Sequence, residues 1–150
     1  MRKARSEKEQ ALREKIISDA LRAPFNVYIG LEFLELNPNY GKTRFKFREE
    51  ILNTYGTVHG GALLAFADVS AGMTASMCGY YVTTVSSSLN FLLPAKDTEY
   101  IYCECLKLKT GRHISVFDIR ITDDAGNLLD SGEFSFFNGS TPVLDSRKEN

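Results

Sequence analysis

Residues 53–68 read Asn-Thr-Tyr-Gly-Thr-Val-His-Gly-Gly-Ala-Leu-Leu-Ala-Phe-Ala-Asp and lead into the longest apolar run of the chain. That run covers residues 60–77 and is rich in Ala and Leu, which favour a helix. A helix that is apolar on nearly all sides is typical of a buried, central position. We therefore predict a central helix over residues 60–77, with Gly79 as its stop.

The start of this helix carries residues suited to binding an anion. His59, Gly60 and Gly61 stand where backbone N–H groups lack intrahelical acceptors, and glycine lets a ligand come close to the backbone. Such amides stabilise a developing oxyanion. Asp68 lies further along the same helix, where a carboxylate is costly unless it is paired or used. The combination indicates acyl chemistry, with Asp68 activating water or attacking directly.

The spacing of these groups predicts a site shared between two chains. Gly60 and Asp68 are eight positions apart, which is roughly 12 Å along a helix axis. A carbonyl carbon and its nucleophile must approach to about 3–3.5 Å. Two antiparallel copies of the helix would bring Gly60 of one chain near Asp68 of the other, so we expect an obligate homodimer.

The remaining pattern predicts an α+β fold, in which one long antiparallel sheet wraps around the central apolar helix. Alternating and strand-like runs flank that helix, and Asp-Asp-Ala-Gly-Asn at residues 123–127 indicates a hairpin turn. A single domain over residues 1–150 is expected, with a core of about 27–138 and a frayed tail from residue 145. The predicted order is a helix at residues 6–22, strands at 27–36 and 43–48, the central helix, and four strands in meander order at 82–93, 98–109, 112–122 and 128–137.

Composition excludes several function classes. The chain has 150 residues, of which 43% are hydrophobic and 25% charged, and its net charge of −1 disfavours nucleic-acid binding. No run resembles a secretory leader or a membrane span, and three sparse cysteines favour reduced thiols in packing roles. The two histidines form no metal-ligand cluster. We therefore expect a cytoplasmic protein that needs neither metal nor membrane.

Several motifs together resemble the hotdog-fold acyl-CoA thioesterases, in the PaaI-like branch that acts on phenylacetyl-type and other acyl-CoAs. The first is Asn53-x5-His59-Gly60-Gly61-x6-Asp68. The run from Thr84 to Pro94-Ala95 looks like the family's strand after the central helix. Gly111-Arg112 and the turn at 123–128 look like later parts of the pattern, so the resemblance covers roughly residues 27–137.

The resemblance implies roles for individual residues. The Gly60 N–H would polarise the thioester carbonyl, Asn53 would hold that carbonyl or the attacking water, and His59 would orient Asn53 and the helix start. Asp68 from the partner chain would be general base or nucleophile. Ser86 would assist it, with Ser88 as the fallback because alternate strand residues share a face.

Coenzyme A would be part of the substrate, so no separate cofactor is expected. Gly61 would contribute to substrate binding, and Lys109, Arg112 and His113 are candidates for a basic rim that meets the phosphates. Relatives often pair dimers into tetramers, and the sequence does not choose between the two states. A non-catalytic acyl-CoA sensor and an enoyl-thioester hydratase or dehydratase are the alternatives, and the acyl group stays open.

Overall fold

The computed structural model describes residues 2–145, and side chains from residue 6 onward. Its elements are helices α1 (Arg2–Ala20), α2 (Pro24–Ile29) and α3 (Gly60–Ser76), the 3-10 turn η1 (Glu49–Ile51), and six strands. The strands are β1 (Glu32–Asn37), β2 (Tyr40–Lys46), β3 (Tyr80–Phe91), β4 (Tyr100–Thr110), β5 (Ile114–Asp123) and β6 (Leu128–Pro142).

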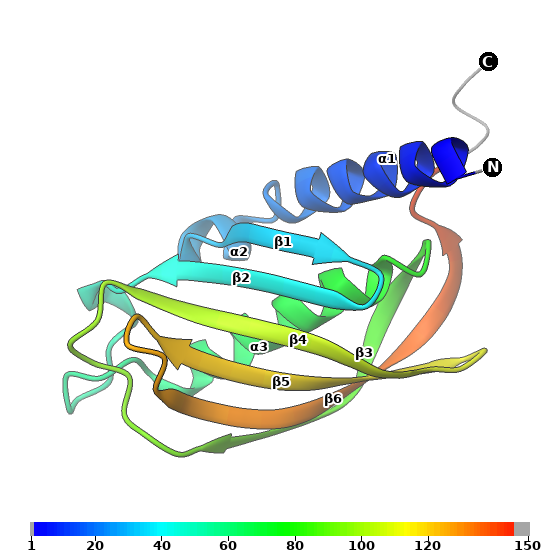
Figure 1. The fold of residues 1–150 in the computed structure, drawn as a ribbon. Coiled ribbons are helices and arrows are strands. Elements are labelled where there is room, and N and C mark those ends of the chain that lie inside the picture. Colours follow the sequence, from blue (N-terminus) through cyan, green and yellow to red (C-terminus); the bar gives the residue numbers. More distant parts are fainter. Residues whose placement is uncertain (1, 146–150) are drawn as a thin grey trace.

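All six strands form one antiparallel sheet in the order β1-β2-β4-β5-β6-β3. Helix α3 lies against one face of this sheet, and α1 runs along its β1 edge (Figure 1). The core is built from the apolar residues of α3 and the strand residues that face it, among them Phe45, Phe66 and Phe134. The central helix and the wrapped antiparallel sheet are therefore confirmed.

Two details of the predicted layout are wrong. Residues 27–29, assigned to the first strand, belong to helix α2. Pro24 suits the first turn of a helix, and Gly30 with φ 72° closes it, so the strand begins only at Glu32. The later strands are also not a simple meander, because β3 crosses to pair with β6 at the sheet edge.

Strand β3 is a long edge with little cover in a single chain. Val85 at its middle is 58% exposed, and nearly every residue around it is exposed as well. An unpaired edge of this kind is a template for pairing with another chain. The predicted frayed tail lies beyond the described residues, apart from Asp145.

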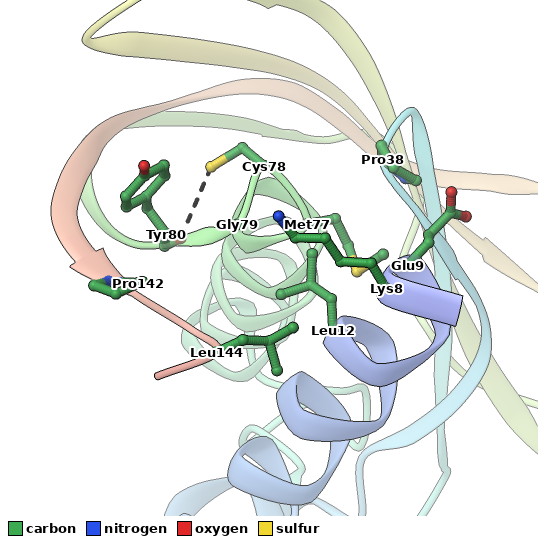
Figure 2. Close-up of a pocket in the computed structure, with 10 residues that line it drawn as sticks. All are labelled: Lys8, Glu9, Leu12, Pro38, Met77, Cys78, Gly79, Tyr80, Pro142 and Leu144. Carbon is green, nitrogen blue, oxygen red and sulfur yellow. Dashed lines mark hydrogen bonds between the residues drawn. The ribbon is translucent and has the colours of Figure 1, made fainter. Parts of the chain in front are cut away.

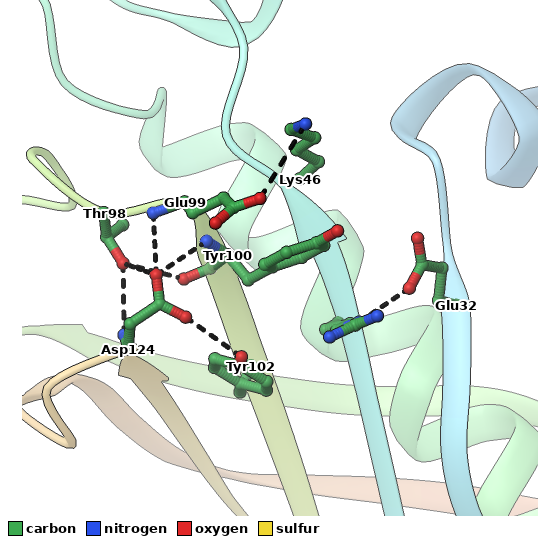
Figure 3. A network of polar contacts seen from close by, with 8 residues as sticks. Glu32, Lys46, Thr98, Glu99, Tyr100, Tyr102 and Asp124 are labelled. Atoms are coloured by element: carbon green, nitrogen blue, oxygen red, sulfur yellow. Dashed lines mark hydrogen bonds and ion pairs between the residues drawn. The ribbon is translucent and has the colours of Figure 1, made fainter.

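The strand ends near the β5–β6 turn are held by one carboxylate, Asp124. It accepts hydrogen bonds from the N–H groups of Glu99 and Tyr100 and from the hydroxyls of Thr98 and Tyr102 (Figure 3). These donors, led by the Tyr100 amide, lower the pKa of Asp124 to about 2. The predicted turn is thus stabilised by a carboxylate whose partners all come from the start of β4 and the loop before it.

The cysteines divide between core and surface. Cys103 and Cys105 are free and buried in the core, as predicted for packing residues, and burial raises the pKa of Cys105. Cys78 is free but exposed, so the packing role predicted for it is wrong. In the described part of the chain, no helix has the length and hydropathy needed to cross a membrane.

Candidate active site

At the start of α3, one backbone amide has no acceptor among the described residues. His59 is the N-cap, and its Nδ1 accepts the Gly61 N–H at 2.8 Å. The next two amides, of Ala62 and Leu63, both donate to the His59 carbonyl. The four amides that lack an acceptor four residues earlier are those of His59, Gly60, Gly61 and Ala62. The His59 N–H donates to the Ile51 carbonyl, so among the described residues only the Gly60 N–H has no acceptor. Gly60 therefore presents the donor, whereas the Gly61 amide is committed to His59.

The His59 ring is held in place by this hydrogen bond, in which its Nδ1 is the acceptor. The prediction that His59 orients Asn53 finds no direct hydrogen bond among the described residues. Instead His59 closes the helix start through Gly61.

Asn53 is held by the turn that precedes the helix. Its Oδ1 accepts the N–H groups of Tyr55 and Thr57, at 2.9 and 3.2 Å, and its Nδ2 donates to the Thr57 hydroxyl at 2.9 Å. One of the two amide hydrogens on Nδ2 is left for a ligand. Thr57 therefore positions Asn53, a role that the motif pattern did not reveal.

A cavity of about 310 Å³ opens beside Gly60 and Asn53. Its wall is otherwise mostly apolar and includes Leu63 and Phe91. A Cβ on residue 60 would lie 3.3 Å from a ring carbon of Phe91, so glycine is what lets this wall come close to the backbone. The helix start thus faces an apolar space of the size that binds small ligand groups.

The same cavity is lined by an acidic residue that the sequence pattern did not single out. Asp130 at the start of β6 lines it, and the residue is 0% exposed. Neither carboxylate oxygen has a hydrogen-bond partner among the described residues. Burial raises the pKa of Asp130 to about 7. Counting back by twos from the core residues Phe136 and Phe134 reaches Asp130, so strand alternation was the signal that could have found it.

Asp68 lies two turns inside α3, on the side of strand β3. The Thr84 hydroxyl donates to its Oδ1 at 2.7 Å. The Asp68 side chain is partly exposed, since β3 is the open edge of the sheet. Asp68 is therefore oriented by its own chain and accessible from outside it.

The hydroxyl beside Asp68 is Thr84 rather than Ser86 or Ser88. Between Thr84 and Ser86 the β3–β6 register shifts, so one extra residue interrupts the alternation. Beyond the shift, Ser87 pairs with the buried Phe134, whereas Ser86 and Ser88 pair with Ser135 and Glu133.

Directly paired residues of two antiparallel strands point to the same face. Ser86 and Ser88 do share a face, as predicted, but it is the face turned away from α3. Within one chain, the hydroxyl that donates to Asp68 is therefore that of Thr84, whereas the assisting role expected of Ser86 stays a prediction.

The predicted basic rim lies at the other end of the helix. Lys109, Arg112 and His113 belong to the β4–β5 hairpin, near the C-terminal end of α3 (Figure 1). Arg112 and His113 line a cavity of about 700 Å³ together with Cys78, which follows α3. His113 stacks on Phe137 with the ring centroids 6.2 Å apart. Within one chain, the structure does not bring these residues to Gly60.

Another hollow, of about 300 Å³, lies between α1 and the turn after α3 (Figure 2). Lys8 and Leu12 of α1 face Met77 and Cys78 there. It contains none of the predicted catalytic residues. Among the described residues, no group of three or more His, Cys, Asp or Glu side chains could hold a metal ion.

Comparisons with known proteins agree with this geometry. The family model described as the thioesterase superfamily matches residues 55–129, which include the helix start and Asp68. A protein of Mycobacterium tuberculosis, named as a candidate esterase, is 28% identical over 116 residues, which are 73% of this chain and 82% of that protein. Its solved structure has a TM-score of 0.74 at 27% identity and covers 78% of this chain and 97% of that chain.

Two further structures extend the likeness. A hypothetical thioesterase of Streptococcus pneumoniae, crystallised with coenzyme A, has a TM-score of 0.74 at 25% identity and covers 86% of this chain and 98% of its own. The PaaI protein of E. coli, from the phenylacetic acid degradation operon, has a TM-score of 0.80. It is 16% identical and covers 87% and 98% of the two chains, so this likeness concerns the fold alone.

These matches confirm the resemblance that the motifs predicted, and they support acyl-thioester hydrolysis as the general activity. The family model spans half of the chain, from the loop before α3 to the start of β6. On this match and this architecture, the chain belongs to the thioesterase superfamily and has the hotdog fold.

Proposed function

We propose that this protein is an acyl-CoA thioesterase, which hydrolyses an acyl-CoA to a carboxylic acid and coenzyme A. The observation that carries the proposal is the Gly60 N–H, the one amide of the α3 start without a recorded acceptor in the described residues, at the wall of an apolar cavity. A donor fixed in this way matches the oxyanion that forms when a thioester is attacked. The coenzyme A bound to the Streptococcus pneumoniae thioesterase supports this choice of thioester.

The two halves of the proposed site come from two subunits. Gly60 and Asp68 are separated by roughly 12 Å of helix axis, which is too far for one substrate carbonyl. The exposed edge β3 supports an isologous dimer, because its free backbone groups can pair with the same strand of a second copy. In that arrangement, Asp68 and Thr84 of one chain face the Gly60 cavity of the other.

The mechanism follows from these positions. Asp68, held by Thr84, takes a proton from water as the water oxygen bonds to the thioester carbon. The carbonyl oxygen becomes an oxyanion that accepts a hydrogen bond from the Gly60 N–H. The free amide hydrogen of Asn53 donates a second hydrogen bond, either to that oxygen or to the water. The carbon–sulfur bond then breaks, the carbonyl reforms, and the proton on Asp68 passes to the thiolate of coenzyme A.

The basic hairpin fits the same dimer. Antiparallel copies of α3 place the C-terminal end of one helix beside the N-terminal end of the other. Lys109, Arg112 and His113 of one subunit would then lie on the side of the partner's site, where the coenzyme A phosphates carry negative charge. Hydrolysis of acyl-CoA would take place in the cytoplasm, where the three free cysteines would remain reduced.

Release of free thiol from a panel of acyl-CoAs tests the activity. The wild-type protein should release coenzyme A from at least one saturated acyl-CoA of short or medium chain, with turnover well above the spontaneous rate. Binding of acyl-CoA without any thiol release would contradict the proposal and indicate an acyl-CoA sensor. Hydration of an enoyl-CoA without hydrolysis would indicate a hydratase.

A further inference from the structure

One residue that lines the cavity beside Gly60 has a buried carboxyl group with no part in the proposed mechanism. Asp130 is directly paired with Phe91 in β3 and Ile121 in β5, so its side chain points to the core face of the sheet. Both oxygens are buried and have no partner among the described residues. A buried polar group without a hydrogen bond costs about 1–3 kcal/mol, and a charged one costs more. A fold does not gain stability from such a group.

Another carboxylate of the same β5–β6 hairpin receives a full set of hydrogen bonds from the chain. Asp124, at the β5–β6 turn, receives two amide and two hydroxyl hydrogen bonds. Asp130 is on the same hairpin and receives none among the described residues. Among the described residues, the lining of its cavity supplies no other charged side chain, and the free amide hydrogen of Asn53 makes no hydrogen bond with Asp130. The missing partner is therefore expected from a ligand in the cavity.

We propose that Asp130 is a specificity-determining residue, which binds a hydroxyl group on the acyl part of the substrate. The inference rests on the proposed thioesterase activity, because it requires the acyl group to occupy the cavity beside Gly60. An apolar pocket with one buried polar group orients a ligand through that group. The preferred substrates are then hydroxylated acyl thioesters rather than plain ones.

A hydroxyl suits this position better than a cation. A hydroxyl both donates and accepts, so it pairs with the carboxyl group whether or not the carboxyl is protonated. The raised pKa of Asp130, about 7, means that both forms are present at neutral pH. An ammonium group would have to lose its water inside an apolar pocket and would require the ionised carboxylate there.

The test compares hexanoyl-CoA with hydroxyhexanoyl-CoA isomers whose hydroxyl is moved stepwise from carbon 3 to carbon 6. We expect the wild type to favour at least one isomer over hexanoyl-CoA by about tenfold or more in kcat/KM. In Asp130→Leu that preference should fall to about twofold or less, while hexanoyl-CoA is still hydrolysed. Asp130→Asn keeps a donor and an acceptor and should retain part of the preference.

Controls separate recognition from stability and from catalysis. Glu133→Gln alters an exposed carboxylate on the other face of the same strand and should leave the preference unchanged. Asp130→Leu should fold at least as stably as the wild type, because it removes an unpaired buried carboxyl.

Binding of the non-hydrolysable thioethers hexyl-CoA and hydroxyhexyl-CoA, measured by calorimetry, reports recognition even if no thioester is turned over. A hydroxyl preference in binding without hydrolysis would reject the proposed function and keep the role of Asp130. The proposed role of Asp130 would be overturned if the wild type bound hydroxylated and plain ligands with equal affinity. It would also be overturned if the preference for the hydroxylated ligand persisted in Asp130→Leu.

Discussion

The two ends of the candidate site differ in how complete they are within one chain. At the start of α3, Gly60, Asn53 and Asp130 line a pocket whose lining residues all come from one subunit, and we call this part the pocket half. At the middle of α3, Asp68 is partly exposed and accepts a hydrogen bond from Thr84 on the exposed edge strand β3, and we call this part the open half. The pocket half is thus built by the chain alone, whereas the proposed catalytic carboxylate faces the place where a second chain would lie.

The two aspartates show the same contrast. In the described part of the chain, the Asp68 side chain accepts a hydrogen bond from Thr84 and is partly exposed, which suits a group that must exchange protons with water. Asp130 is buried without a partner among the described residues, and its pKa is raised to about 7. We therefore assign chemistry to the open half and substrate recognition to the pocket half. The predictions that follow can break that assignment.

The largest effect is expected at the open half. Asp68→Asn should lower kcat by about 10²–10⁴-fold, because the amide cannot take a proton from water. The temperature of thermal unfolding should change little, since the amide keeps the Thr84 hydrogen bond. Thiol release and differential scanning fluorimetry measure the two quantities. Unchanged turnover would remove Asp68 from the mechanism.

The pocket half is tested by the pH dependence of the free energy of unfolding. The Asp130 carboxyl has a pKa of about 7 in the folded chain and an ordinary value of 3.8. Between these values the folded protein holds a proton that the unfolded chain has lost, so stability falls as pH rises. The stability of Asp130→Leu relative to wild type should grow by something on the order of 4 kcal/mol from pH 4 to pH 8. Urea unfolding at several pH values measures it, and a constant difference would show that Asp130 is not buried as described.

Removing the Gly60 donor should also be costly. Gly60→Pro deletes the N–H, and proline is tolerated at the first helical position, where the preceding His59 is already extended. We expect kcat to fall by about 10²–10³-fold. Gly60→Ala keeps the N–H but adds a Cβ against Phe91, so it controls for bulk. A similar loss of kcat in both variants would mean that the Gly60 N–H does not stabilise the oxyanion.

The smallest effect is expected at the hydroxyl beside Asp68. Thr84→Val removes a hydrogen bond to a carboxylate and should lower kcat/KM by about tenfold. Thr84→Ser keeps the hydroxyl and should therefore keep the hydrogen bond. Ser86→Ala serves as the matched control and should stay within about twofold of wild type, because Ser86 faces away from α3. A larger loss in Ser86→Ala than in Thr84→Val would restore the assignment made from the sequence.

The sequence predicted what local rules determine. Helical apolarity and the glycines located α3 and its start, and the family motif pointed to Asp68. The Ser86 assignment came from the family resemblance, and alternation only named Ser88 as its fallback. The register shift after Thr84 turns both serines away from α3, and no residue type in β3 indicates that shift. The crossing of β3 to the far edge depends on contacts between distant segments, so the predicted meander missed it.

The shared site is the central claim, and complementation between Gly60→Pro and Asp68→Asn tests it most directly. The two variants are coexpressed with different tags, and the mixed dimer is purified through both. One of its two sites would combine an intact Gly60 with an intact Asp68, so we predict about half of the wild-type activity per dimer. Activity no higher than that of either parent dimer would contradict a site built from two subunits.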